Sequence, residues 1–349
     1  MPDRAFDLLV PYIQSAPENS LWLADENLLQ ASVTPNPALI VISNRLDLAA
    51  DFETAGWHQQ FSDFDLSGIA DNSITRICYR ISKEKPLVHH LINEAARVLR
   101  PDGELILTGD KGEGIKGYID KAAKLLGGDK TASKADANTW LGIISQGATD
   151  VSRLLDSKEY PSFRQAPQDG QFHFWSKPGQ FGWNKIDKGS ALLIEHLPEI
   201  LKRLAAKPER ILDIGCGYGY LSLKTSALLP DSQIIACDNN AAALASCQRN
   251  FEEYAVNGEV IAASCAQGVT GKFELIVCNP PFHAGFDVEF DLTDRFLQAT
   301  RDKLHKDGLA AYVVNQHIPL ERKARNYFAI AETYLDSGNF KLVLLQHPC

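Results

Sequence analysis

Short apolar runs alternate with longer stretches of helical periodicity through the second half of the chain. The apolar runs predict strands at 210–214, 233–237, 259–263, 273–278 and 309–314. Between them, apolar positions at helical spacing predict helices at 189–206, 221–229, 241–254, 292–304 and 320–328. Strands that alternate with helices form a mostly parallel sheet. Two last runs, 331–335 and 340–345, are joined closely enough for a hairpin, so this sheet is expected to end in an antiparallel pair.

The first half has a similar pattern. Strands are expected at 38–42, 60–64, 74–79, 104–108 and 140–145, and helices at 5–14, at 87–99 and in a stretch that ends at 126. The segments 77–105 and 277–309 resemble each other at an offset of about 200 residues, which favours duplication of one α/β domain. A segment rich in Pro, Gly, Ser and Gln places the linker near 160–170, so the domains are expected at 1–165 and 166–349.

Composition narrows the class of protein. The 349 residues carry a net charge of −9, of which −6 falls on residues 1–165 (17 Lys and Arg against 23 Asp and Glu). A nucleic-acid partner would therefore have to meet a local basic patch. The seven cysteines form no C-x-x-C pair, so neither a disulfide framework nor a metal site is expected. The sequence contains neither a signal peptide nor a membrane-spanning apolar run, which predicts a cytoplasmic protein without a membrane partner.

A glycine-rich loop follows the strand at 210–214. It reads D-x-G-x-G-x-G, with Asp213 near the strand end and glycines at 215, 217 and 219. Glycine lets the backbone turn sharply and approach a ligand, as in nucleotide-binding α/β sheets. The spacing differs from the G-x-G-x-x-G of dinucleotide sites. An acidic group at the loop repels phosphate and pairs with an ammonium, which favours S-adenosylmethionine as the cofactor.

Other candidate cofactor residues lie at the ends of neighbouring strands. Asp238, with Asn239 beside it, follows the second strand, where an acidic side chain can accept both ribose hydroxyls of a nucleoside. Ser264 follows the third strand, where an adenine amino group would be bound. Gly189 and Ser190 open the helix before the central strand and are expected to close over the methionine end of the cofactor.

The stretch Asn279-Pro280-Pro281-Phe282 follows the strand 273–278, at the sheet edge where ligands collect. Two prolines stiffen the backbone and withhold N–H donors. The Asn279 side-chain oxygen and the Pro280 carbonyl can then accept both hydrogens of a planar exocyclic amine, and Phe282 can stack on its ring. Such an amine is a poor nucleophile, so we interpret these residues as catalytic. The first half has Tyr79-Arg-Ile-Ser in place of this stretch and Ile42-Ser-Asn-Arg-Leu in place of the glycine loop, so it is expected to lack cofactor and chemistry.

With the flanking residues His283-Ala-Gly285 and the segment 181–190, these motifs resemble the ribosomal RNA guanine-N2 methyltransferases, and among them the small-subunit (RsmC-like) family. The resemblance implies two tandem Rossmann-like domains, the second with a seven-stranded sheet ending in an antiparallel hairpin. It implies a degenerate first copy that aids folding and substrate binding, and a second copy that methylates the 2-amino group of a guanosine in 16S ribosomal RNA within a small subunit. His283 is then expected to position the guanine.

Alternatives remain at this stage. The large-subunit guanine-N2 enzymes have a similar motif, and adenine-N6 or glutamine methyltransferases use the same Asn-Pro-Pro motif to bind an amine. A ribosome-assembly protein without catalysis would keep the fold, and an NAD oxidoreductase is opposed by the glycine spacing. The candidate phosphate contacts are Lys177, Lys185, Lys188, Lys202, Arg203 and the basic residues of 322–325.

Overall fold

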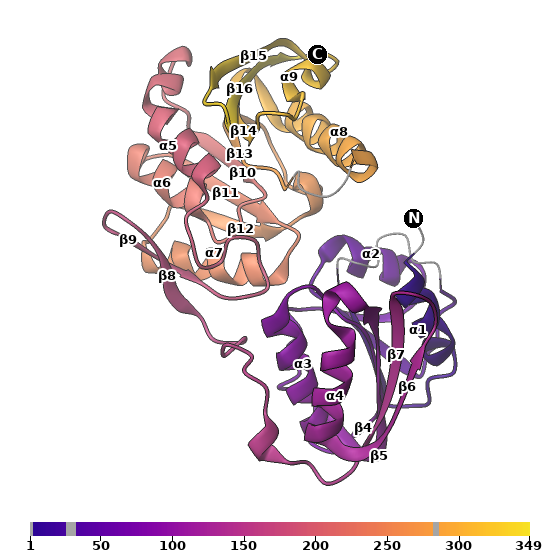
Figure 1. Cartoon of the computed structure of the whole chain (residues 1–349). Helices are drawn as coiled ribbons and strands as arrows, with labels where there is room; N and C mark the ends of the chain where they lie inside the picture. Colours follow the sequence, from indigo (N-terminus) through magenta and orange to yellow (C-terminus); the bar gives the residue numbers. More distant parts are fainter. Residues whose placement is uncertain (1–2, 26–32, 282–285) are drawn as a thin grey trace. The chain divides into compact units, whose positions relative to one another are not determined.

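The computed structural model describes residues 3–25, 33–281 and 286–349, without the side chains of 166 and 286–291 (Figure 1). The chain divides into two compact units, residues 1–162 and 163–349, which are described separately. In the described ranges no helix is long and apolar enough to cross a bilayer.

Unit 2 contains a seven-stranded sheet in the order β12-β11-β10-β13-β14-β16-β15. The first five strands run parallel, whereas β16 is antiparallel to both β14 and β15. The strands are β10 (Arg210–Ile214), β11 (Gln233–Asp238), β12 (Gly258–Ala262), β13 (Phe273–Cys278), β14 (Leu304–Asn315), β15 (Phe328–Asp336) and β16 (Phe340–Pro348). The expected sheet with a terminal antiparallel hairpin is confirmed.

Helices cover both faces of this sheet. They are α5 (Lys188–Ile200), α6 (Tyr220–Leu228), α7 (Ala241–Glu253), α8 (Phe286–Lys303) and α9 (Leu320–Ala324). Since side chains alternate along a strand, Ile211 packs with α5, α6 and α7, whereas Leu212 packs with α8 and α9 on the other face. Burial on both faces explains why the central strands are continuous apolar runs.

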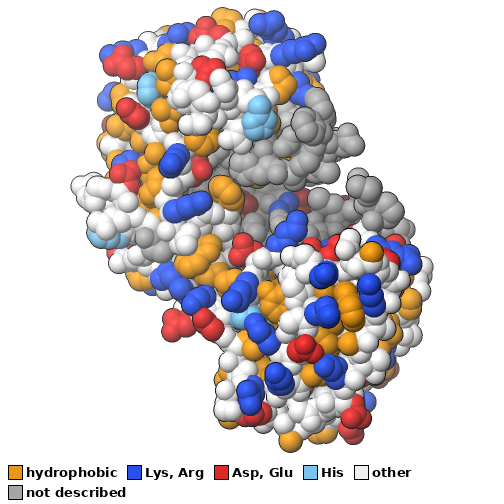
Figure 2. All heavy atoms as spheres, viewed as in Figure 1, with side chains coloured by type: hydrophobic (Ala, Val, Ile, Leu, Met, Phe, Trp, Pro, Cys, Tyr) orange, Lys and Arg blue, Asp and Glu red, His pale blue; other side chains and the backbone are white. Residues whose placement is uncertain are grey.

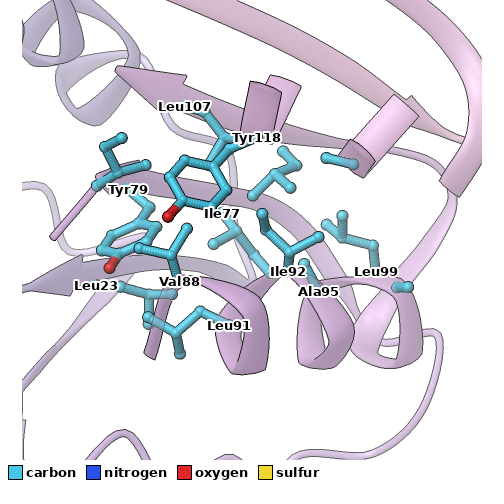
Figure 3. Packing of buried hydrophobic residues seen from close by; sticks show 14 of the residues in the cluster. Leu23, Ile77, Tyr79, Val88, Leu91, Ile92, Ala95, Leu99, Leu107 and Tyr118 are labelled. Carbon is cyan, nitrogen blue, oxygen red and sulfur yellow. The ribbon is translucent and has the colours of Figure 1, made fainter. Parts of the chain in front are cut away.

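Unit 1 repeats the same sheet, in the order β3-β2-β1-β4-β5-β7-β6. Its strands are β1 (Ser20–Ala24), β2 (Leu39–Ser43), β3 (His58–Phe61), β4 (Ile74–Arg80), β5 (Leu99–Asp110), β6 (Gly127–Lys134) and β7 (Thr139–Gln146). Its helices are α1 (Arg4–Gln14), α2 (Leu46–Thr54), α3 (Lys85–Val98) and α4 (Ile115–Leu126). Figure 3 shows one core of this unit, where Val88 and Ile92 of α3 pack against Ile77 of β4 and Leu107 of β5.

The strand orders correct the alignment of the two copies. β1 occupies the position of β10, and β2 occupies that of β11. The segment Ile42-Ser-Asn-Arg-Leu therefore corresponds to the end of β11, not to the glycine loop as expected. The counterpart of that loop follows β1, from Asp25 into residues outside the described part. The expectation was wrong because the sequence predicted no strand at β1, so the first predicted strand, 38–42, was aligned with β10 and the alignment was shifted by one strand.

A buried ion cluster occupies the end of β4, the counterpart of the strand that precedes Asn279. The Arg80 guanidinium is 5% exposed and lies 2.8 Å from Asp3 and 2.6 Å from Glu113. It also donates to the carbonyl of Ile81. Charged groups that are buried and mutually paired leave little polar capacity for a ligand. This edge of unit 1 therefore differs in chemistry from the same edge of unit 2.

Three further strands, each part of a hairpin, lie where the sequence did not predict them. β6 pairs antiparallel with β7 at the end of the unit 1 sheet. In the expected linker at 160–170, β8 (Arg164–Asp169) pairs with β9 (Phe172–Ser176), and β9 contacts α7.

Candidate active site

The candidate site lies at the carboxyl edge of the unit 2 sheet. Ile214 of β10 is paired with Cys237 of β11 and with Cys278 of β13. The next residue of each strand is Gly215, Asp238 and Asn279, so these three positions are neighbours across the edge. The structure thereby brings together the three motifs that the sequence singled out.

The glycine loop is bent back onto β11. The backbone N–H groups of Gly215 and Cys216 both donate to the Cys237 carbonyl, at 2.8 and 3.0 Å. Gly217 has φ +56°, and a Cβ built there meets no heavy atom within 4 Å. Gly219 has φ +87°, and a Cβ there would lie 2.8 Å from the Cys247 sulfur of α7. The absence of a side chain at Gly219 thus allows the glycine loop to pack closely against α7, whereas Gly217 borders open space.

Asp238 connects the glycine loop to α7. Its Oδ2 accepts from the Gly217 N–H at 2.9 Å, and its Oδ1 accepts from the Asn240 N–H at 2.9 Å. Asn240 in turn caps α7 by accepting from the Ala243 N–H. The Asp238 and Asn239 side chains are half-buried. Asp238 is therefore held against the loop, as an acidic residue that binds a ribose would have to be.

The placement of the Asp213 side chain differs from the expected one, in which its carboxyl group faces the glycine loop. Its side chain is fully buried, and its Oδ2 accepts from the Ser222 hydroxyl of α6 at 2.6 Å. Burial raises the pKa of this carboxyl group to about 7, although the hydrogen bond from Ser222 acts in the opposite direction. A side chain without exposed surface does not point into the loop, so the structure gives no support to its pairing with an ammonium. Instead it joins β10 to α6.

Ser264 lies in a short 3-10 turn after β12. Its buried hydroxyl accepts from the Arg295 guanidinium of α8 at 2.9 Å. The next residue, Cys265, adopts φ +45°. The hydroxyl is thus turned toward α8, and its expected contact with adenine stays a prediction.

The side-chain amide of Asn279 is oriented by the start of α5. Its Nδ2 donates to Asp187 Oδ1 and to Ser190 Oγ, both at 2.8 Å. Asp187 Oδ1 also accepts from the Ser190 N–H at 2.9 Å and so caps the helix. An amide nitrogen carries two hydrogens, and both are used here, so Oδ1 remains as the acceptor.

Gly189 lets these groups come together. A Cβ built there would lie 3.1 Å from Asp187 Oδ1, Phe340 and Val313, so there is little room for a side chain. Gly189 and Ser190 therefore lie beside Asn279. Asp187 was missed as a functional residue, although an Asp directly before the start of a predicted helix is a capping signal.

The sequence of this chain is similar to those of known proteins. The family model of the methyltransferase small domain matches residues 171–344. Ribosomal RNA small subunit methyltransferase C of Shewanella amazonensis is 30% identical over 262 residues, 74% of each chain. The chain belongs to the ribosomal RNA small subunit methyltransferase C family.

Two further proteins are similar to this chain over both of its units. The Shewanella pealeana protein of the same name is 27% identical over 343 residues, 93% of this chain and 95% of its own. The structure of the T. thermophilus 16S rRNA N2 G1207 methyltransferase in complex with AdoMet and guanosine has a TM-score of 0.82 at 22% identity, covering 99% and 92% of the two chains. The two-unit fold is thus the fold of that protein.

The other residues that were expected to be catalytic are Pro280, Phe282 and His283. Phe282 and His283 lie outside the described residues. Pro280 is buried directly after Asn279. In the part that the structure describes, no group of three His, Cys, Asp or Glu side chains could hold a metal ion.

The candidate phosphate contacts differ in accessibility. Lys177 is only 6% exposed. Lys202 and Arg203 pair with Glu199 and Glu332, and Lys323 pairs with Asp294. Four others are exposed: Lys185, Lys188, Arg322 and Arg325.

Proposed function

We propose that this chain transfers a methyl group from S-adenosylmethionine to the 2-amino group of a guanosine in 16S ribosomal RNA. The family and the activity of the similar T. thermophilus protein, a 16S rRNA N2 G1207 methyltransferase, support this reaction. The observation that carries it is the Asn279 amide, whose two hydrogens are used by Asp187 and Ser190. An oxygen acceptor beside the glycine loop suits a target that is an amine.

The residues of the glycine loop fit the cofactor. Gly217 borders open space that a Cβ would fill, and the half-buried Asp238 is held next to it by the Gly217 N–H. We infer that this pair holds the nucleoside, and that Gly189 and Ser190 lie at the methionine end. When bound, S-adenosylmethionine supplies an electrophilic methyl group on a sulfonium centre.

The protein itself contributes position and polarity. The guanine 2-amino nitrogen is weakly nucleophilic because its lone pair is delocalised into the ring. Asn279 Oδ1 and the Pro280 carbonyl accept its two hydrogens and thereby fix the amine relative to the loop. These acceptors also favour the positive charge that develops on the nitrogen. A rigid acceptor pair can therefore act without a general base at the moment of transfer.

We further propose that unit 1 contributes to substrate binding and to the stability of the fold. Lys and Arg side chains gather over α3 and α4 of this unit (Figure 2). The lysine face consists of the exposed Lys85, Lys116, Lys121, Lys124 and Lys130. Asp120, the one acidic residue of α4, pairs with Lys130. Such a local basic face suits a phosphate backbone on a chain whose net charge is negative. The substrate is then rRNA within a small ribosomal subunit in the cytoplasm.

The product of the reaction tests the proposal. Bare 16S rRNA, assembled small subunits and, separately, assembled large subunits are incubated with methyl-labelled S-adenosylmethionine, after which label in protein is counted and the RNA is digested to nucleosides. We expect N2-methylguanosine, and its loss in Asn279→Ala but not in Asn326→Ala, which removes an exposed amide elsewhere on unit 2. A labelled N6-methyladenosine, or label only in large-subunit RNA or protein, would overturn the assignment.

A further inference from the structure

The segment 179–187, called the aromatic loop below, is fixed to α7 at its first end. The Gly179 carbonyl accepts from the Asn240 side chain at 2.9 Å. The next residue, Gln180, is buried and donates to the Ser246 hydroxyl of α7 at 2.6 Å. This end of the aromatic loop is therefore hydrogen-bonded to α7 and to its N-cap residue, Asn240, whose N–H donates to Asp238.

The other end of the aromatic loop is fixed to the active site. The Tyr218 hydroxyl of the glycine loop donates to the Lys185 carbonyl at 3.1 Å. The Lys185 N–H donates to the Gly182 carbonyl and closes a turn. Asp187 then receives the hydrogen bond from Asn279. Hydrogen bonds at both ends hold the intervening residues in a defined position.

Two aromatic side chains lie between these anchors. Phe181 is 61% exposed, and it is the only aromatic among the exposed large hydrophobic side chains of the described residues. Trp183 is half-buried, and the Arg164 guanidinium lies 5.2 Å from the centre of its ring. A single exposed apolar side chain is common on protein surfaces, but a ring on a loop that is hydrogen-bonded to the active site at one end is placed where it can contact the substrate.

The charges beside these rings suit a nucleic acid. Lys185 of the aromatic loop and Lys188, the first residue of α5, are exposed, and Asp187 between them accepts hydrogen bonds from Asn279 and Ser190. Aromatic rings that alternate with cations are typical of proteins that bind single strands, where bases stack and phosphates pair with Lys. A duplex does not present its base faces in this way.

We propose that Phe181 and Trp183 stack on bases that flank the target guanosine, so that the RNA must be single-stranded there. Trp183 is four residues from Asp187, so the two are at most about 14 Å apart along the chain. That distance corresponds to a few nucleotides. An enzyme that acts on a base edge needs the base outside a helix, and the stacking surface would hold the strand open beside Asn279. This inference rests on the proposed function and defines its substrate.

The test compares Phe181→Ala with Phe181→Tyr, which keeps a ring, and with Ile330→Ala, which shortens an exposed apolar side chain elsewhere on unit 2. Binding of a mixed-sequence single-stranded oligoribonucleotide and of its duplex is measured for each protein. We expect the wild type to prefer the single strand, Phe181→Ala to lose about tenfold in affinity for it, and both other variants to behave as the wild type. Cofactor binding should be unchanged in all four proteins.

The kinetic consequence separates this inference from the proposed function. With the rRNA substrate, Phe181→Ala should raise KM about tenfold and leave kcat nearly unchanged. If the wild type forms N2-methylguanosine but Phe181→Ala binds and turns over like it, the stacking surface is wrong and the function stands. If the wild type forms another product, the proposed function fails. The comparison of single-strand and duplex binding then still tests whether Phe181 and Trp183 form a stacking surface. Equal wild-type affinity for single strand and duplex would overturn the inference.

Discussion

Asp187 connects two tasks through one oxygen atom. Its Oδ1 accepts from the Ser190 N–H, which caps α5, and from the Asn279 Nδ2, which orients the amide of the active site. We expect Asp187→Ala to lower kcat/KM for RNA about 100-fold, because a freely rotating amide misplaces the target amine. It should also lower the free energy of unfolding by about 1 kcal/mol through loss of the cap. Steady-state kinetics and urea unfolding measure the two effects.

A second variant separates the two tasks of Asp187. Ser caps a helix nearly as well as Asp, but its shorter hydroxyl replaces the carboxylate that Asn279 contacts. Asp187→Ser should therefore unfold like the wild type and remain as inactive as Asp187→Ala. Recovery of activity together with stability would mean that Asp187 acts only as a cap.

Asp213 makes stability depend on pH. Its folded-state pKa of about 7 lies above the ordinary value of about 3.9. The folded state thus holds the proton more tightly than the unfolded state, and this group lowers stability as the pH rises from about 4 to 7. Asp213→Asn cannot ionise, so its stability relative to the wild type should increase by about 2–3 kcal/mol between pH 5 and 7 and stay level above pH 8. Urea unfolding at pH 5, 7 and 8 measures this, and a constant difference would contradict it.

Some of these residue roles could be predicted from the sequence. Gly215, Asp238 and Asn279 each follow a strand, and parallel strands bring their carboxyl ends to one edge. The orientation of Asp213 could not be predicted, because it depends on which face of β10 is covered by α6. The role of Asp187 depends on a contact with a residue 92 positions away in the chain, which a local motif does not reveal.

Among the elements, buried strands with strong apolar runs were predicted well, and polar or isolated ones were not. β10 and β13 have the expected bounds. β6, Gly-Gly-Asp-Lys-Thr-Ala-Ser-Lys, has no large apolar side chain and forms only because it pairs with β7. β1 is buried along its whole length but has only five residues, and so short an apolar run does not by itself distinguish a strand from a loop. Tertiary pairing, not local propensity, decides such strands.

The glycine loop provides a matched test of cofactor binding. Gly217 and Gly338 both have positive φ, +56° and +84°, and a Cβ at either position meets nothing within 4 Å. Gly338 lies in the turn between β15 and β16. Replacement of either by Ala should cost about 1 kcal/mol of stability through backbone strain. Only Gly217→Ala should weaken binding of S-adenosylmethionine, because its methyl group occupies the space beside Asp238.

Calorimetric titration with S-adenosylmethionine and thermal unfolding of both variants make this comparison. We expect a loss of at least tenfold in cofactor affinity for Gly217→Ala and an unchanged affinity for Gly338→Ala. If the two variants bind the cofactor equally well, the open space at Gly217 is not where the cofactor lies.

Across the whole molecule, charge is distributed unevenly. The chain carries −9 overall, yet the lysine face of unit 1 presents exposed cations on α3, α4 and β6. One of them, Lys116, lies 4.7 Å from the ring centre of Trp140. A protein with this distribution should bind RNA through a few local contacts and repel it elsewhere, so its affinity should depend on salt through those contacts.

The salt dependence of RNA binding tests the role of unit 1. Each phosphate contact contributes about 0.7–0.9 to the slope of log affinity against log salt concentration. The double variant Lys116→Gln/Lys124→Gln should reduce this slope by about 1.5, because the two lysines no longer displace counterions. The control, Lys207→Gln/Lys306→Gln, makes the same change in net charge at exposed positions of unit 2 and should leave the slope unchanged. Binding of 16S rRNA at several salt concentrations gives both slopes. Equal reductions would mean that net charge, not the lysine face, governs the encounter, and an unchanged slope in the first variant would place the RNA on another surface.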